Sequence, residues 1–130
     1  FYCYFFFFCF FGIHYYIIRK KKRILYYMKL IIKKSDRPDK EYMALFKENG
    51  KVVKTTHFGD PNLNQYVSRS GPKVTDQQRD NYISRHEKDL DTGDPQRAGY
   101  LSLHILWSYK TKSRSIRTNI KDYKERFGFD

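Results

Sequence analysis

The chain has little of what redox and metal sites are built from. Its 130 residues include two cysteines, Cys3 and Cys9, and both lie near the start. Residues 28–130 contain none, so this part forms neither a disulfide framework nor a thiolate metal site, and it suits a reducing compartment. The sequence also lacks a glycine-rich phosphate loop, HExxH and G-x-S-x-G, so no catalytic motif among these indicates a reaction.

Metal-binding patterns are absent from the same region. The spacing of its three histidines, His57, His86 and His104, matches no standard zinc set. A metal-dependent nuclease needs clustered carboxylates to hold a divalent cation. The acids are instead spread over expected loops and caps, at Asp36, Asp39, Asp60, Asp89, Asp91 and Asp94. We expect no metal, no cofactor and no catalytic residues, so an enzyme is the less favoured interpretation.

Charged side chains are missing from the first 18 residues apart from His14, and five consecutive cations follow at 19–23. A membrane-spanning helix is one interpretation, because it needs roughly 20 apolar residues and cations on its cytoplasmic side. The composition argues against it. The stretch has no Leu, Ala or Val, and its four tyrosines would bring hydroxyl groups into hydrocarbon.

A second interpretation of this segment starts from Met28, the first methionine of the chain. Phe, Tyr, Ile and Lys, which dominate the preceding residues, are what translated thymine- and adenine-rich DNA encodes. We therefore interpret residues 1–27 as translated upstream sequence, with an N-terminal membrane anchor as the alternative. Residues 28–130 are long enough for a single globular domain with one modest core.

Residues 28–130 are basic. The chain has 26 Lys and Arg, of which five lie at 19–23, so 21 remain against 14 Asp and Glu and the net charge is +7. Such a charge favours an anionic partner such as nucleic acid. A small domain also carries a net charge of this size for solubility alone, and that alternative stays open.

Three strand-like runs predict an antiparallel sheet. The strongest signal is Asn49-Gly50, the preferred pair for a two-residue type I′ hairpin, between the runs 42–48 and 51–58. A third strand is expected at 29–34, beside the first strand of the hairpin.

The hairpin loop also predicts the register of its two strands. A two-residue loop places Phe46 opposite Val53 on one face of the sheet. The same face then holds two further pairs, Ala44 with Thr55 and Tyr42 with His57. The other face is expected to carry Met43, Leu45, Val52 and Phe58.

About three helices are expected after the sheet, which makes the predicted fold class α+β. Thr75 and Gln78 form a capping-box pattern that opens a helix to about residue 88. Asp94-Pro95 marks the start of a second helix, and the third spans about 113–127. The residues expected to pack against the core are Tyr82, Ile83, His86, Leu90, Ala98, Leu101, Ile105, Trp107, Ile116, Ile120, Tyr123 and Phe127.

The third helix carries a basic edge beside its apolar residues. Its four cations fall within about 80° of one another at 100° per residue, and they are Arg114, Arg117, Lys121 and Lys124. Such an edge is typical of surfaces that contact phosphates without reading bases. It is therefore the predicted site for nucleic acid or another anion, with a solvated helix face as the alternative.

A second candidate site involves the first helix. Arg79 and His86 lie seven residues apart and hence on one side of that helix, with Tyr82 between them. A cationic, aromatic-walled pocket for a phosphate or carboxylate would combine His57, Arg79, Tyr82, Arg85, His86 and Trp107. The favoured alternative places Tyr82 and His86 in the core and the arginines at a solvated or salt-bridged edge.

Five short motifs are spread along this region. They are KKS-x-RP-x-K at 33–40, HFG at 57–59, Y-x-x-RH at 82–86, GYLS at 99–102 followed by LW, and Y-K-x-x-F at 123–127. On these motifs the region resembles a family of small basic proteins encoded by nucleocytoplasmic large DNA viruses of algae and protists, a domain of unknown function. The resemblance covers nearly all of 28–130 and implies a viral origin without an activity.

The chain departs from the family pattern after the hairpin. Relatives tend to have Asp-Tyr-Thr followed by His-Lys-Asp, where this chain has Gln65-Tyr66-Val67 and then 68–73. It also has Leu90 where an aromatic residue is usual. A ligand that this loop binds in relatives is therefore not implied here.

Together these observations predict a small basic viral protein that is associated with the virion or binds nucleic acid. Its expected partners are nucleic acid or another anion, and capsid proteins. Its expected location is the virion or the reducing cytoplasm of an infected cell. Two alternatives remain: a small enzyme or nuclease accessory that uses the candidate pocket, and a membrane-anchored viral protein if residues 1–27 are genuine.

Overall fold

The structure is a computed structural model, and it describes residues 28–67 and 73–130. The interpretation of residues 1–27 lies outside these residues. In the described part of the chain, no helix is long and apolar enough to cross a membrane. Its elements, in order, are β1 (Lys29–Lys34), β2 (Tyr42–Glu48), β3 (Lys51–Phe58), α2 (Asp76–His86), the 3-10 turn η1 (Glu87–Leu90), α3 (Ala98–Leu101), the π-helical turn η2 (Ser102–Leu106) and α4 (Ile116–Phe127).

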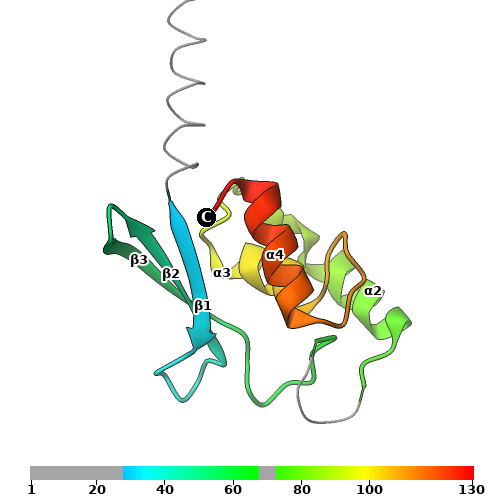
Figure 1. Ribbon diagram of the computed structural model, residues 1–130. Coiled ribbons are helices and arrows are strands. Elements are labelled where there is room, and N and C mark those ends of the chain that lie inside the picture. The colour runs from blue at the N-terminus through cyan, green and yellow to red at the C-terminus, as the bar shows by residue number, and fades with distance from the viewer. Residues whose placement is uncertain (1–27, 68–72) are drawn as a thin grey trace, which may run out of the picture.

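The three strands form one antiparallel sheet in the order β1-β2-β3, and the helices gather on one side of it (Figure 1). The predicted α+β fold class is therefore confirmed, as is the place of β1 beside β2. The C-terminus runs beside β1, where Leu30 donates to the Asp130 carbonyl at 2.9 Å and Asp130 donates to the Met28 carbonyl at 3.0 Å.

The hairpin forms at the predicted residues. Both turn positions have positive φ, 51° at Asn49 and 78° at Gly50, as a type I′ turn requires. Asn tolerates this left-handed conformation because its short polar side chain bonds locally, and Gly tolerates it because it has no Cβ. Local chemistry alone therefore specifies where β2 ends and β3 begins.

The predicted register of the hairpin is wrong beyond its first pairs. A bulge between Phe46 and Lys47 leaves Lys47 opposite Val52 but shifts Phe46 to a position opposite Lys54. Because side chains alternate between faces, one extra residue in β3 moves the rest of that strand to the other face. Two further pairs change with it: Ala44 lies opposite Thr56, and Tyr42 lies opposite Phe58.

The physical reason for the bulge is the burial of Phe58. In the expected register this side chain would leave the core, whereas the bulge places it on the inner face beside Tyr42. The two rings stack with centroids 5.8 Å apart. Burying a phenylalanine contributes roughly 1.5–3 kcal/mol, which offsets the local loss of ladder geometry. The core then joins this face to the helices through Leu30, Ala44, Phe46, Phe58, Leu101, Ile105, Leu106 and Tyr123.

Helix α2 begins as expected and ends earlier. The capping box is confirmed: Gln78 N donates to the Thr75 hydroxyl at 3.2 Å, and Thr75 N donates to Gln78 Oε1 at 2.9 Å. The α-helix ends at His86 instead of residue 88 and continues as η1. The stripe expected to be buried (Tyr82, Ile83, His86 and Leu90) is only half-buried.

The second helix does not begin at Asp94-Pro95. Instead Asp94 accepts a hydrogen bond from Gln96 N at 2.9 Å, which forms a turn, and α3 starts three residues after Pro95. The Pro95 carbonyl is used elsewhere, as the acceptor for the Tyr123 hydroxyl. Of the expected packing residues, Leu101, Ile105 and Trp107 are buried, and Ala98 is exposed.

Helix α4 starts later than predicted and ends as predicted. Ser115 is its N-cap and accepts from Thr118 N at 3.3 Å, so residues 113–115 precede the helix. Gly128 ends it in the left-handed conformation with φ 72°. Tyr123 of the expected apolar seam is fully buried; the partly buried members are Ile116, Ile120 and Phe127.

A neutral histidine lies in this core. His104 is 4% exposed, its Nδ1 has no hydrogen-bond partner within the described residues, and rings surround it. The rings within contact distance belong to Tyr100, Tyr109, Tyr123 and Phe127. Burial, with a smaller contribution from the nearby charge of Arg126, lowers the pKa of His104 from 6.5 to about 4.

We predict that this histidine destabilises the fold in acid. His104 is protonated near pH 6.5 in the unfolded chain but only near pH 4 in the folded chain. The free energy of unfolding is therefore highest above pH 6.5 and decreases as the pH falls to about 4. The difference in pKa corresponds to roughly 3 kcal/mol in the free energy of unfolding. Denaturant unfolding of the parent and of His104→Phe at pH 7 and pH 4 measures it. Equal losses in both proteins would contradict this assignment.

We also predict that the hairpin turn depends on Gly50. Changing Gly50→Val should lower the free energy of unfolding by about 1 kcal/mol or more, because a β-branched residue resists positive φ. A Cβ at this position would meet no neighbour within 4 Å, so the backbone conformation is the only cost. The matched control is Lys51→Val, one residue on and exposed in β3. Equal free energies of unfolding in urea for the two variants would contradict the dependence of the turn on Gly50.

Candidate functional site

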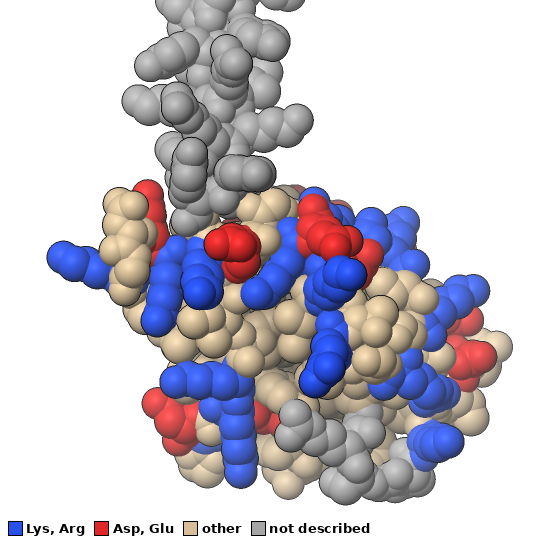
Figure 2. All heavy atoms as spheres, in the orientation of Figure 1, with Lys and Arg blue, Asp and Glu red and all other residues tan. Residues whose placement is uncertain are grey.

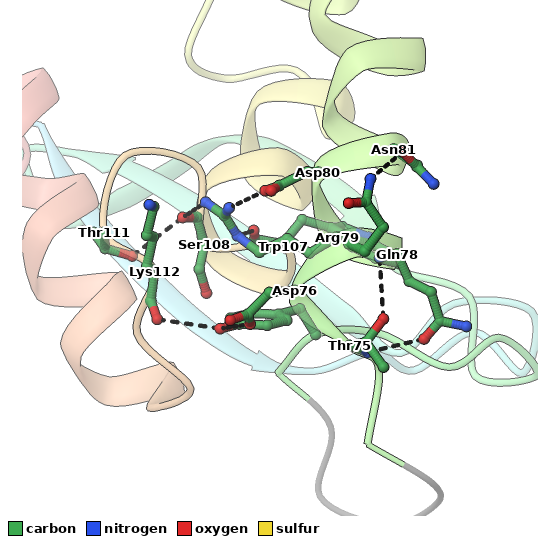
Figure 3. Close-up of polar contacts among 12 residues, drawn as sticks. Thr75, Asp76, Gln78, Arg79, Asp80, Asn81, Trp107, Ser108, Thr111 and Lys112 are labelled. Carbon is green, nitrogen blue, oxygen red and sulfur yellow. Dashed lines mark hydrogen bonds and ion pairs between the residues drawn. The ribbon is translucent and has the colours of Figure 1, made fainter.

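A buried arginine ties α2 to the chain that follows η2. Arg79 is 6% exposed and is the only buried residue of α2. Its Nε donates to the Trp107 carbonyl at 3.0 Å, and its Nη2 donates to the Ser108 carbonyl at 2.7 Å (Figure 3). Its Nη1 pairs with Asp80 at 2.7 Å. The guanidinium is therefore engaged within the fold and is not a wall of the candidate pocket. Of the alternative, a solvated or salt-bridged edge, Arg79 shows the salt bridge but not the solvation.

The polar contacts of Arg79 continue into α4. Ser108, which has φ 52°, also places its hydroxyl next to the buried Asn119 of α4. Asn119 Nδ2 donates to the Ser108 hydroxyl at 2.8 Å and to the Ile105 carbonyl at 2.9 Å. Its Oδ1 accepts from the Thr111 hydroxyl at 2.8 Å. One buried network thus fixes α2, the turn after η2, and α4 relative to one another.

Three aromatic residues of the predicted pocket form a continuous stack. Tyr82 lies flat on Trp107, with ring centroids 3.7 Å apart and planes 5° apart, and His86 stacks on the other side of Tyr82 at 4.2 Å. His86 Nδ1 also lies 3.3 Å from Asp89. Burial raises the pKa of Tyr82 above its usual value. The structure brings these three side chains together as the sequence suggested.

His57 is not part of that group. Its Nδ1 lies 2.8 Å from the Ser35 hydroxyl, and its Nε2 lies 3.8 Å from Asp36. The Ser35 hydroxyl also accepts from Arg37 N at 3.0 Å. These contacts hold the turn after β1 against β3, on the face of the sheet opposite to the core. No contact within the described residues links His57 to Tyr82 or Trp107.

A cavity of about 380 Å³ opens beside Trp107. Its wall comes from the middle of α2 and from residues on either side of 68–72, and the lining residues are Asn64, Lys73, Val74, Gln78, Asn81, Arg85 and Trp107. Of the six predicted pocket residues, Arg85 and Trp107 line it. The amides were missed, although Gln78, Asn81 and Arg85 follow one another at spacings of three and four, which places them on one face of α2.

The predicted basic edge loses one member. Arg114 precedes α4, and its guanidinium donates to the Tyr66 and Val74 carbonyls at 3.1 and 2.8 Å and lies 3.9 Å from the Tyr66 ring centre. It therefore secures the segment before α2. The correction follows from the later start of the helix, because Arg114 is no longer on the helical face with the other cations.

The other three cations form an edge along α4, which we call the α4 edge: exposed Arg117 and Lys121, and partly buried Lys124. At 100° per residue they lie within about 60° of one another. Lys121 is 78% exposed and 4.0 Å from Glu125, and no ion pair within the described residues involves Arg117 or Lys124. A surface pair of this kind contributes little, so all three charges are available to a partner.

Asn119 decides which way the α4 edge points. It lies roughly 140–160° around the helix from the three cations and faces the turn after η2. The α4 edge therefore lies on the opposite flank of the helix, away from that turn. Figure 2 shows Lys and Arg side chains spread across the face that β1 and α4 present, with smaller groups of Asp and Glu among them. Strand alternation places exposed Lys34, at the end of β1, on the same face of the sheet as buried Leu30.

The outer face of the sheet carries a second basic area that sequence reasoning missed. Lys29 lies directly opposite Lys47, and like charges in that position destabilise a sheet. Neither forms an ion pair within the described residues. Between them and Lys33 the face exposes Ile31 and Leu45 in part. Strand alternation places these residues on one face, but only the pairing of β1 with β2 reveals the opposed lysines.

Metal ligands do not gather in the part of the chain that the structure describes. No group of three or more His, Cys, Asp or Glu side chains there is able to hold a metal ion.

We predict that Arg79 stabilises the fold more than Arg85, the other arginine of α2. Replacing Arg79→Met removes the donor to the Trp107 carbonyl and one of the donors to the Ser108 carbonyl, which should cost about 3 kcal/mol in the free energy of unfolding. The control Arg85→Met removes an exposed cation that forms no ion pair in the described chain and should change stability by about 0.5 kcal/mol or less. Urea unfolding followed by Trp107 fluorescence distinguishes them. Similar losses in the free energy of unfolding for both variants would contradict this role of Arg79.

Comparisons of this chain with protein-family models, curated proteins and solved structures gave no match. The resemblance to viral proteins therefore stays a prediction. In the structure, residues from separate motifs meet: Ser35 bonds His57, and Tyr82 stacks on Trp107.

Proposed function

We propose that residues 28–130 bind the phosphate backbone of nucleic acid in a sequence-tolerant way. The observation that carries the proposal is the α4 edge, where exposed Arg117 and Lys121 and partly buried Lys124 lie side by side with one weak ion pair among them. The net charge of +7 over residues 28–130 supplies a long-range attraction for a polyanion.

The chemistry of α4 favours phosphates over base edges. Its only amide side chain, Asn119, is buried and bonded to the Ile105 carbonyl, so it is not available to read adenine. The three cations of the α4 edge form charge-assisted contacts with phosphate oxygens, and such contacts position a protein without specifying a sequence. A few contacts of this kind give an affinity on the order of micromolar at low salt.

The viral resemblance suggests a setting for this activity. A small basic protein of a large DNA virus would coat or package nucleic acid in the virion or in the infected cell, with capsid proteins as further partners. The runner-up is a small enzyme or nuclease accessory. It has less support, because Arg79 is used within the fold and the described residues contain no cluster of metal-binding side chains. A membrane-anchored protein depends on residues 1–27 alone.

We predict that reversing two charges of the α4 edge weakens binding to all sequences alike. In the double variant Arg117→Glu with Lys121→Glu, the slope of log affinity against log salt should flatten by about two, because two phosphate contacts are lost. Fluorescence anisotropy of the full chain with labelled duplexes of different sequence, over a series of salt concentrations, measures both quantities.

The charge-matched control is Lys51→Glu with Lys88→Glu, two exposed cations outside the α4 edge that form no ion pair within the described residues. It changes the net charge equally and should retain most of the affinity. An α4-edge variant that binds as the parent does, or a parent that does not bind at low salt, would favour the alternative of a solvated helix face.

A further inference from the structure

We infer that the cavity beside Trp107 is a second binding site, and that it takes a nucleoside monophosphate. The site is distinct from the α4 edge, because its lining comes from α2, the segment before it and Trp107. A volume of about 380 Å³ falls within the range of small-molecule sites, roughly 300–1,000 Å³.

The lining is rich in donors. Lys73 and Arg85 are exposed cations, and neither forms an ion pair within the described residues. None of the described lining residues is acidic. The acids that α2 does carry nearby, Asp76 and Asp80, lie beside Arg114 and Arg79. The cavity therefore favours an anion, and its two cations are suited to a phosphate.

The amides of α2 are oriented by bonds made within the protein. Gln78 Oε1 accepts from Thr75 N at 2.9 Å, and Asn81 Oδ1 accepts from Gln77 Nε2 at 2.9 Å (Figure 3). Each oxygen thus accepts one bond within the protein, while neither amide nitrogen has a partner within the described residues. Two NH₂ groups remain as donors for a ligand, beside the amide of Asn64.

The aromatic wall of the cavity is rigid. Trp107 stacks on Tyr82, and its carbonyl is held by Arg79, so the ring is fixed before a ligand arrives. A fixed wall reduces the entropic cost of binding. Amides beside an indole suit a planar heterocycle with hydrogen-bonding edges, and the cations suit its phosphate. A nucleoside monophosphate combines both groups, either as a free nucleotide or as the 5′ end of a strand.

Trp107 is the only tryptophan of the chain, so its fluorescence reports on this cavity directly. Titrating the full chain with AMP should give a saturable change in Trp107 emission. Inorganic phosphate should bind more weakly, because it lacks the heterocycle. A 5′-phosphorylated trinucleotide and its unphosphorylated form distinguish the two sources: binding of the phosphorylated strand indicates a strand end, and binding of AMP alone indicates a free nucleotide.

The variant Arg85→Gln should weaken AMP binding by about tenfold, since it removes one charge-assisted contact. The matched control Lys88→Gln, an exposed cation outside the cavity, should bind as the parent does. If Arg85→Gln does not fold, Lys73→Gln provides the same test from the other wall. Emission that does not respond to AMP, equal affinity for AMP and phosphate, or unchanged binding in both cavity variants would overturn the assignment.

The proposals for the cavity and for the α4 edge can be tested independently of each other. The double variant Arg117→Glu with Lys121→Glu should retain the AMP response, because neither residue lines the cavity. Loss of DNA binding with the AMP response intact would leave the cavity standing. DNA binding that depends on the α4 edge, without any AMP response, would overturn only the cavity.

Discussion

The arrangement of the helices depends on how the backbone around Ser108 is satisfied. This turn has positive φ at Ser108, Lys110 and Lys112, a conformation that costs free energy for residues other than glycine. Its buried carbonyls need donors, and an unsatisfied one would cost about 1–3 kcal/mol. Arg79 supplies the donor to the Trp107 carbonyl from α2 and adds one to the Ser108 carbonyl, which also accepts from Thr111 N and Lys112 N. Asn119 supplies one to the preceding Ile105 carbonyl from α4. The same polar groups that permit the turn therefore fix both helices against it.

Both proposed binding surfaces follow from this constraint. Arg79 holds the backbone of Trp107, so the indole forms one wall of the cavity, while the opposite face of α2 presents Arg85 and its amides. Asn119 turns one flank of α4 toward the buried turn, so the cations of the α4 edge lie on the other flank, where Arg117 and Lys121 are exposed and Lys124 is partly exposed. Both α2 and α4 therefore carry cations on the side that does not contact the buried network.

Sequence reasoning succeeded where a few adjacent residues decide the outcome. Asn49-Gly50 specified the hairpin, and Thr75 with Gln78 specified the start of α2, because each uses only local bonds and dihedral angles. It failed where distant residues decide. The bulge in β3 depends on packing Phe58 beside Tyr42, and the burial of Arg79 depends on carbonyls almost thirty residues away. Asn64 and Lys73, which line the cavity, lie in a stretch of sequence without periodicity, so no pattern identifies them.

The most direct test of the account is to map where DNA contacts the protein. In NMR spectra of the ¹⁵N-labelled full chain titrated with a short duplex at low salt, we expect shifts concentrated at Arg117, Lys121 and Lys124. These shifts should decrease as salt is added, because the contacts are electrostatic. Shifts confined to the outer sheet face around Lys29 and Lys47, or no shifts at low salt, would contradict the central claim that the α4 edge binds phosphates.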